Sequence, residues 1–369
     1  MQKQKIVPWR DGKELVMTST SSKPRVDWVD YAKGLCIILV VMMHSTLGVE
    51  KAAGGVSWLN GFIEWARPFR MPDFFLISGL FLSARLDRPW QSYFDSKVLH
   101  FIYFYVLWMT IQFATKGYGI YQETGAVGLV QSYLMGFIEP FGTLWFIYML
   151  AVFFVVVKAL RHVPAWIIFV AAALLEIAPI DTGHILIDEF ASRFVYFFTG
   201  YWLARQVFAF ATEVDRKSVA AIAAGLFVWG AANGFAVHHG WSHLPVVSLV
   251  MGFIGAGAVI SMGVLLSKTG LAVALRYCGE NSIVIYLAFF LFMAGSRGLL
   301  LKLAPGLDLG VMSLAVTAAG VIGPLLLFWA VRNTKVRFLF RRPQWARLAT
   351  TPRGWHSVPH ADIASPQAR

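Results

Sequence analysis

The sequence predicts an all-α integral membrane protein, a bundle of about ten transmembrane helices. Of the 369 residues, 57% are apolar and only 14% are charged, whereas soluble domains carry roughly 25% charged residues. The mean hydropathy is +0.62. Apolar runs recur along most of the chain, and many approach the roughly 20 residues that a helix needs to cross a bilayer. A soluble globular domain is therefore excluded.

Ten apolar segments set the expected order of the membrane helices. The predicted spans are 29–48, 69–85, 98–115, 141–158, 164–180, 190–207, 218–237, 245–266, 281–297 and 309–331. A further apolar piece, 127–139, is short and ends at Glu139-Pro140, which predicts a re-entrant or interfacial segment. We accordingly divide the chain into a basic cytoplasmic tail (1–26), a ten-helix membrane domain (27–332) and a second basic cytoplasmic tail (333–369).

The distribution of charge predicts the topology. With ten spans and a cytoplasmic N-terminus, 25 of the 32 Lys and Arg residues fall on the cytoplasmic side, as the positive-inside rule requires. The outer side keeps seven: Lys51, Arg67, Arg70, Lys116, Arg193, Arg297 and Lys302. Both termini are therefore expected in the cytoplasm. The net charge of +12 then faces anionic lipid, so the bilayer is an expected partner and nucleic acid is not.

The first span carries the strongest candidate for an active site. Lys33 and His44 are eleven residues apart, about three helical turns, which places them on one face and roughly 16 Å apart along the axis. An ionisable group at that depth is costly unless it faces a partner or a wet cavity. The histidine could instead bond a neighbouring helix, and the lysine could reach the interface. Asp30 is placed to pair with Lys33.

Other polar residues in the spans allow a functional and a structural interpretation. Asp73 follows Pro72 inside the second span, where a carboxylate seeks a cation. Arg67 and Arg70 lie on the outer side and suit an anionic acceptor or a helix-start anchor. Arg193 is expected to pair with Glu189, four residues earlier. No zinc-ligand spacing, phosphate-binding glycine loop or nucleophile elbow is present, so neither a metal nor a permanently bound cofactor is expected.

Four motifs resemble those of the membrane-bound acyltransferase 3 family. Asp30-Tyr-Ala-Lys33-Gly34 with His44 is similar to its first-helix motif, a basic residue, ten residues and a histidine. Met71-Pro-Asp73-Phe-Phe-Leu-Ile-Ser78-Gly79 resembles its second-helix signature, and Gly142-Thr-Leu-Trp145-Phe146 and Asn281-Ser-Ile-Val-Ile-Tyr286-Leu287 look like two later ones. The resemblance spans about 27–330. The form of the first motif with Lys33-Gly34 resembles that of the fucose 4-O-acetylase-like and uncharacterised inner-membrane members of the family.

The resemblance implies an O-acyltransferase in the bacterial inner membrane. It would move an acyl group, usually acetyl, from cytoplasmic acyl-CoA, the co-substrate, to a hydroxyl of a cell-envelope glycan. The matched catalytic positions are His44 and Lys33, the latter where the family usually has arginine. The expected substrate-binding residues are Asp30, Arg70, Asp73, Ser78, Trp145, Asn281 and Tyr286. The expected acyl-CoA phosphate ligands are Arg85, Arg88, Lys97 and His100.

The sequence departs from the family in ways that keep two alternatives open. Where the family commonly has two arginines three apart, this chain has Lys97 and His100, and Phe289 stands where a histidine is frequent. Lysine also lacks the bidentate fork of arginine. A transporter or flippase would explain the same intramembrane charges, and a non-catalytic relative would explain the departures. Transport of a substrate without acyl-CoA would support the transporter. Turnover of acyl-CoA would exclude the non-catalytic relative.

Overall fold

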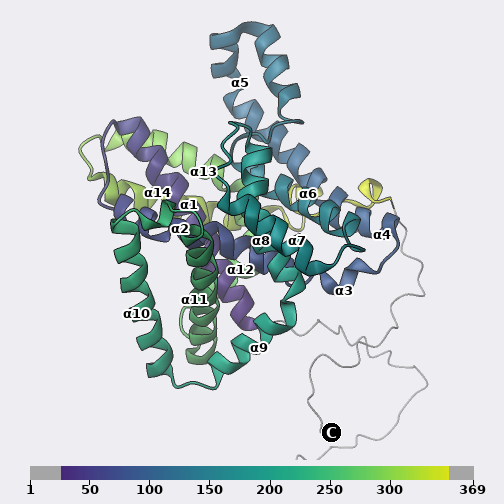
Figure 1. The fold of residues 1–369 in the computed structure, drawn as a ribbon. Coiled ribbons are helices and arrows are strands. Elements are labelled where there is room, and N and C mark those ends of the chain that lie inside the picture. Colours follow the sequence, from purple (N-terminus) through teal and green to yellow (C-terminus); the bar gives the residue numbers. More distant parts are fainter. Residues whose placement is uncertain (1–25, 349–369) are drawn as a thin grey trace, which may run out of the picture.

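The protein is helical throughout the part that the computed structural model describes, residues 26–348, where no strand occurs. Figure 1 shows the arrangement. The helices are α1 (Asp27–Ala53), α2 (Asn60–Gly79), α3 (Ser83–Leu86), α4 (Trp90–Phe94), α5 (His100–Met135), α6 (Trp145–Ala159), α7 (Ala165–Ile177), α8 (Ile185–Trp202), α9 (Ala204–Asp215), α10 (Val219–His238), α11 (Val247–Thr269), α12 (Val273–Glu280), α13 (Ser282–Leu303) and α14 (Leu309–Val331). Short turns of other helix types are Asp95–Leu99, Gly142–Leu144, Trp241–His243, Lys335–Leu339 and Gln344–Ala346.

Each of the ten predicted spans coincides with a helix, which confirms the all-α membrane class. In the described part of the chain, 7 helical segments are long and apolar enough to cross a bilayer. The other three expected spans correspond to α2, α7 and α8. Helix α7 has only 13 residues, while α2 and α8 carry several charged residues within their length. The placement of both termini in the cytoplasm stays a prediction.

The structure corrects several boundaries. Helix α2 begins at Asn60 rather than near residue 69 and includes Pro68 and Pro72, because neighbouring helices in a membrane protein can satisfy the backbone groups that proline frees. Helix α8 begins at Ile185 rather than near residue 190. The first residues of the second predicted tail form two short helical turns. The tail at 1–25 and residues 349–369 lie outside the described residues.

The segment 127–139, predicted to be re-entrant or interfacial, lies in the returning arm of a helical hairpin and the turn that follows it. Helix α5 is interrupted at Gly125, whose φ of 70° and ψ of −173° are not helical. Figure 1 shows this end of α5 rising above the rest of the bundle and turning back. Glycine adopts such a positive φ without the steric cost that other residues meet, so the chain reverses there and returns toward α6.

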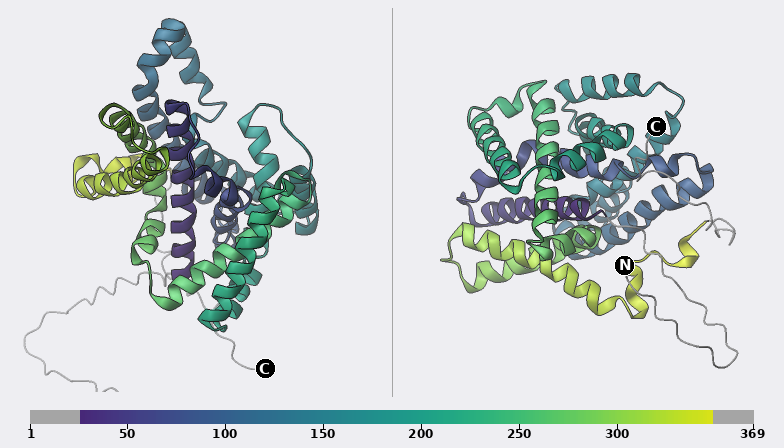
Figure 2. Two further views of the ribbon diagram at one scale, coloured as in Figure 1. Left: turned by 90° about the vertical axis from the view of Figure 1, so that its left-hand side faces the viewer. Right: turned by 90° about the horizontal axis from the view of Figure 1, so that it is seen from below.

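Helix α1 packs against α2, α11, α12, α13 and α14, and Figure 2 shows α13 and α14 together on one side of it. Its first turns approach α12 backbone to backbone. A Cβ at Gly34 would overlap the carbonyl of Leu275, and a Cβ at Gly279 would overlap the carbonyl of Asp30. Small residues allow such close helix contacts in membranes. The pair therefore fixes the end of α1 that carries Lys33.

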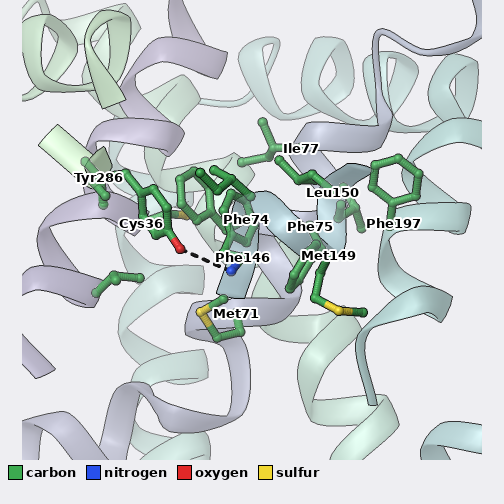
Figure 3. Packing of buried hydrophobic residues seen from close by; sticks show 14 of the residues in the cluster. Cys36, Met71, Phe74, Phe75, Ile77, Phe146, Met149, Leu150, Phe197 and Tyr286 are labelled. Carbon is green, nitrogen blue, oxygen red and sulfur yellow. Dashed lines mark hydrogen bonds between the residues drawn. The ribbon is translucent and has the colours of Figure 1, made fainter. Parts of the chain in front are cut away.

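An aromatic cluster joins α2, α6 and α13 beside α1 (Figure 3). Phe74 and Phe146 stack with their ring centroids 4.5 Å apart and their planes 5° apart, and Phe75 lies 4.7 Å from Phe146. The Tyr286 hydroxyl accepts a hydrogen bond from the backbone N–H of Phe146 at 3.1 Å and donates one to the Thr143 carbonyl. The second-helix motif thus lies in the packed centre, and these contacts fix the rotation of α2 relative to α6.

Candidate functional site

His44 lies in the C-terminal half of α1, half-buried among its neighbours. Its ring packs against that of Phe289 from α13, with centroids 5.5 Å apart and planes 35° apart. No group among residues 26–348 forms a hydrogen bond with either ring nitrogen. The phenylalanine that replaces a histidine common in the family is thus a packing partner of His44. Phe289 packs against one face of the imidazole.

The predicted pair of Asp30 and Lys33 is present at the other end of α1. The Lys33 Nζ lies 3.9 Å from the Asp30 carboxylate and 5.7 Å from the centroid of the Phe81 ring. Asp30 is buried, whereas the Lys33 side chain remains partly exposed. Lys33 therefore has a carboxylate and an aromatic ring beside it and still reaches solvent.

Arg70 projects from α2 toward the turn of α1 that holds His44. Its guanidinium lies 3.1 Å from the Met43 sulfur and donates to the Ile63 carbonyl at 3.3 Å. Arg70 is only 6% exposed, and its Nε has no hydrogen-bond partner among the described residues. An electrostatic contact couples it to His44. The structure thus brings together two residues that the sequence placed in separate spans.

Asp73, one turn further along α2, is buried more deeply, at 1% exposed. Within residues 26–348 neither carboxylate oxygen has a hydrogen-bond partner. Its nearest electrostatic neighbours include Cys36 and Tyr196, and it does not form an ion pair with Arg70. A buried carboxyl group without partners is costly, which makes Asp73 a candidate to meet a polar ligand.

Three other expected substrate-binding groups use their donors within the protein. Ser78 donates to the Phe74 carbonyl at 2.7 Å, and Asn281 donates to the Tyr277 carbonyl at 2.9 Å. Tyr286 donates to Thr143, as described above. Trp145 packs against Phe75 at 6.0 Å. These contacts stabilise helix ends and helix packing, so in this arrangement the later motifs position α6 and α13.

Sequence reasoning missed two cations close to His44. A Cβ at Gly48, four residues after His44, would overlap the guanidinium of Arg297 from α13. Lys116 of α5 lies 4.5 Å from the ring centroid of Phe290, the neighbour of Phe289, and is electrostatically coupled to Arg297. In the sequence, both residues were visible only as members of the small set of cations predicted on the outer side. Which helices they lie against could be seen only in the packed structure.

The expected acyl-CoA phosphate ligands separate into different places. His100 lines a polar pocket of about 330 Å³ at the start of α5. Lys97 lies beside it on the chain, 4.6 Å from the Phe154 ring centroid. Arg85 and Arg88 lie on and after α3 and do not line the pocket. Burial, and to a lesser extent the charge of Arg88, lowers the pKa of Arg85. The remaining pocket residues are Asp95, Ser96, Phe340, Arg341, Arg342 and Arg347.

The C-terminal strap, which we define as residues 335–348, completes this pocket. Figure 1 shows its short turns beside α4 and α6. Arg342 is 6% exposed. Its guanidinium donates to the backbone carbonyl of Asp95 and to the Asp95 carboxylate, both at 2.7 Å. Trp108 donates to the Leu339 carbonyl at 2.9 Å. A segment expected to be a plain basic tail therefore carries two exposed arginines, Arg341 and Arg347, to the side of His100.

The described residues contain no cluster of three or more His, Cys, Asp or Glu side chains that could hold a metal ion. Both cysteines, Cys36 and Cys278, are free and buried. The polar groups along α1 are a half-buried imidazole, His44, with the paired Lys33 toward one end of the helix and the cations Arg70 and Arg297 near the other.

The helices and this site define a multi-pass membrane protein with an intramembrane histidine. The chain belongs to the acyltransferase 3 family, whose acyltransferase domain it matches over residues 26–332. It is 25% identical over 214 residues to the inner membrane protein YcfT of Escherichia coli (strain K12), covering 52% of this chain and 59% of that protein. It is also 26% identical over 155 residues to the nodulation protein NolL of Mesorhizobium japonicum, covering 41% of each chain.

The alignments therefore extend over about half of the length of these relatives, 59% and 41%. No solved structure matches the chain. The family membership agrees with the resemblance seen in the motifs and covers all of the membrane domain.

Proposed function

We propose that this protein is an O-acyltransferase of the bacterial inner membrane, which transfers an acyl group, most simply acetyl, from cytoplasmic acyl-CoA to a hydroxyl of a cell-envelope glycan. The observation that carries the proposal is His44, an imidazole inside a membrane helix with no hydrogen bond to its ring from residues 26–348. It lies in a chain that belongs to an acyltransferase family. A histidine inside a membrane helix is costly, and the cost must be offset by a partner or by a function.

His44 acts as the general base in this proposal. The neutral imidazole accepts the proton of the acceptor hydroxyl as that oxygen attacks the thioester carbonyl. The new C–O bond forms, the C–S bond breaks, and the CoA thiolate leaves and takes the proton from the imidazolium. Phe289 holds the ring plane while this happens.

The pocket beside His100 is the proposed binding site for the donor phosphates. Arg341 and Arg347 offer planar guanidinium groups, which bind phosphate in a bidentate manner. They replace the arginine pair that the sequence lacks at Lys97 and His100. By the predicted topology this pocket faces the cytoplasm, where acyl-CoA is available.

The decisive experiment compares envelope glycans from cells that carry the wild type, His44→Ala or His238→Ala. His238 is an exposed histidine at the end of α10 and serves as the matched control. We expect acylation to fall to background with His44→Ala and to remain with His238→Ala at equal protein levels, as mass spectrometry of the glycans would show. Unchanged acylation in the His44→Ala strain contradicts the mechanism.

The two alternatives predict different results in purified protein. A transporter or flippase would move its substrate in liposomes without acyl-CoA, whereas the proposed enzyme requires acyl-CoA for turnover. A non-catalytic relative would show neither activity. Turnover of acetyl-CoA by the wild type and its loss in His44→Ala would exclude both alternatives.

A further inference from the structure

Two cations from different helices contact one short stretch of α1, and a third lies near one of them. Arg70 of α2 contacts Met43, the residue before His44. Arg297 of α13 lies against Gly48, one turn after His44. Lys116 of α5 lies over Phe290 at 4.5 Å and over Phe141 at 4.9 Å, and its charge interacts with that of Arg297. Arg70 and Arg297 therefore flank the turns of α1 around His44, and Lys116 adds a third positive charge on the side of Arg297.

No carboxylate of residues 26–348 lies within ion-pair distance of these three cations. The nearby acids are engaged elsewhere. Glu64 pairs with Arg67 at 3.2 Å, and Glu189 pairs with Arg193 at 3.1 Å, as the sequence predicted for the latter. Asp73 is on the same helix as Arg70 and does not pair with it. The charges that act on Arg70 are the cations Arg193 and Arg67 and one carboxylate, Glu64, which pairs with Arg67. Lys116 and Arg297 repel each other.

Such an arrangement is unfavourable in the absence of a ligand. Arg70 is buried and has lost most of its hydration, while Lys116 and Arg297 are half-buried. A buried cation without an ion-pair partner is costly, and intramembrane cations normally pair with an anion or face a water-filled path. Two further polar atoms beside His44, the hydroxyls of Ser45 and Thr46, are buried without hydrogen-bond partners in the described part of the chain. The site has donors and positive charge in excess, which an anion would satisfy.

We propose that the acceptor carries an anionic group, a carboxylate or a phosphate, and that Arg70, Lys116 and Arg297 bind it on the outer side of His44. This inference rests on the proposed function and names the substrate class. The anion anchors the acceptor so that a neighbouring hydroxyl meets the imidazole. Positioning of this kind converts the reaction into one between groups already held in place.

The same cations are poorly placed to hold the donor phosphates. Lys116 is sixteen residues beyond His100 on α5, which corresponds to roughly 24 Å along the helix axis. The pocket at His100 already offers arginines for that purpose. Two separate cationic sites on opposite sides of His44 match a reaction with two anionic reactants, the donor from one side and the acceptor from the other.

Binding of small sugars to the purified full-length protein in uncharged detergent tests the proposal without requiring turnover. The probes are D-glucuronate, glucose 6-phosphate and, as the neutral match, D-glucose, followed by thermal stabilisation. We expect saturable stabilisation by at least one anionic sugar and none by glucose. Arg70→Gln, Lys116→Gln and Arg297→Gln should each weaken anion binding about tenfold or more, since each removes a charged hydrogen-bond donor. Lys302→Gln, an exposed cation at the end of α13, should bind like the wild type.

Three results would overturn the proposal. The first is equal binding of glucose and the anionic sugars. The second is unchanged anion binding in all three variants. The third is loss of CoA binding in these variants with no anionic-sugar binding in the wild type, which would assign the cations to the donor. If a variant fails to fold, the salt dependence of binding to the wild type provides the test. Binding of the anionic sugars to the wild type must weaken as NaCl rises from about 0.05 to about 0.5 M.

The outcome is independent of the test of the proposed function. If His44→Ala leaves glycan acylation intact while the anionic sugars bind as expected, the mechanism fails and the anion site stands. If acylation depends on His44 and no anionic sugar binds, the enzyme stands with a neutral acceptor.

Discussion

Arg341 and Arg347 owe their position to the buried residue between them. Arg342 makes two bonds to Asp95 at 2.7 Å, and the Asp95 carboxylate also accepts the backbone N–H of Leu348 at 2.8 Å. A carboxylate with this many donors and a buried arginine forms a local anchor, because removing either partner would leave the other charge buried and unpaired. The exposed arginines on both sides are thereby held at the pocket without buried contacts of their own.

This residue-scale arrangement predicts a specific effect on donor binding. Arg341→Gln and Arg347→Gln should each raise the KM for acetyl-CoA about tenfold, because one charged hydrogen bond to phosphate is lost, and should leave kcat nearly unchanged. Steady-state kinetics of the purified protein measure both values. Arg337→Gln is the control, since Arg337 is exposed on the same strap and does not line the pocket. A KM that is unchanged in both pocket variants would remove the strap from donor binding.

At the scale of helices, α1 depends on two glycines for its close contact with α12. The Gly34 and Gly279 positions each meet backbone atoms of the other helix rather than flexible side chains. Backbone cannot move aside as a side-chain end can, so an added methyl group must push the helices apart. Because Asp30 and Lys33 lie in this contact, separation of α1 from α12 would also displace the pair at that end of the site.

Gly279→Ala should therefore destabilise the protein by about 1–3 kcal/mol, the usual cost of overpacking. Thermal unfolding of the purified protein, followed by fluorescence size exclusion, would show it as a lower midpoint. Gly298→Ala is the matched control, because a Cβ there meets no atom within 4 Å and alanine is the better helix former. Equal midpoints for the two variants would mean that α1 and α12 are not held as closely as described.

The start of α14 carries a cap that should respond to pH. Asp308 accepts hydrogen bonds from the Val311 backbone N–H and the Trp58 indole, both at 2.9 Å. The Val311 N–H first, and then the indole, hold the pKa of Asp308 below its usual range. A lowered pKa in the folded state stabilises the fold above the unfolded value of about 3.9, and this contribution disappears as pH falls through the folded value.

We therefore expect wild type to be more stable than Asp308→Asn near pH 6, with the difference closing as pH falls below the unfolded pKa of about 3.9. Thermal midpoints measured for both proteins across this range provide the test. A difference that stays constant with pH would show that the charge of Asp308 does not contribute.

On the scale of the whole molecule, the topology can be tested by labelling single cysteines. Both native cysteines are buried, so new ones can be placed at exposed positions on each side. In spheroplasts, a membrane-impermeant maleimide should label His239→Cys, after α10, and should leave Lys335→Cys unlabelled until the membrane is permeabilised. The physical reason is the charge bias of the loops. Labelling of Lys335→Cys in intact spheroplasts would invert the topology.

Much of the architecture could be predicted from the sequence, because apolar runs and basic loops are local signals. The ends of α14 at 309 and 331 agree with the expected span. Helix α2 was harder, since its prolines and charges argue against a helix in isolation, and the neighbouring helices that tolerate them are not visible in the sequence. The reversal of α5 at Gly125 was not predicted, because a positive φ at a glycine cannot be recognised from composition.

The site shows the same division between local and long-range information. The pair of Asp30 and Lys33 follows from helical spacing and is present. The contact of Arg297 with Gly48 joins α13 to α1, and the pocket at His100 joins α5 to the strap. Neither contact leaves a periodic trace in the sequence. Spacing within one helix thus identified His44, while its charged neighbours became apparent only once the bundle was assembled.

The bond between Asp95 and Arg342 joins residues 247 positions apart, and this separation has a consequence for biosynthesis. Ribosomes deliver the chain from its beginning, so α1, which carries His44, is made well before α13, α14 and the strap that follows them. Both the ring that packs on His44 and the arginines of the pocket therefore come from the last part of the described chain. If the pocket holds the donor as proposed, a nascent chain has its imidazole but no donor site until the strap has been made.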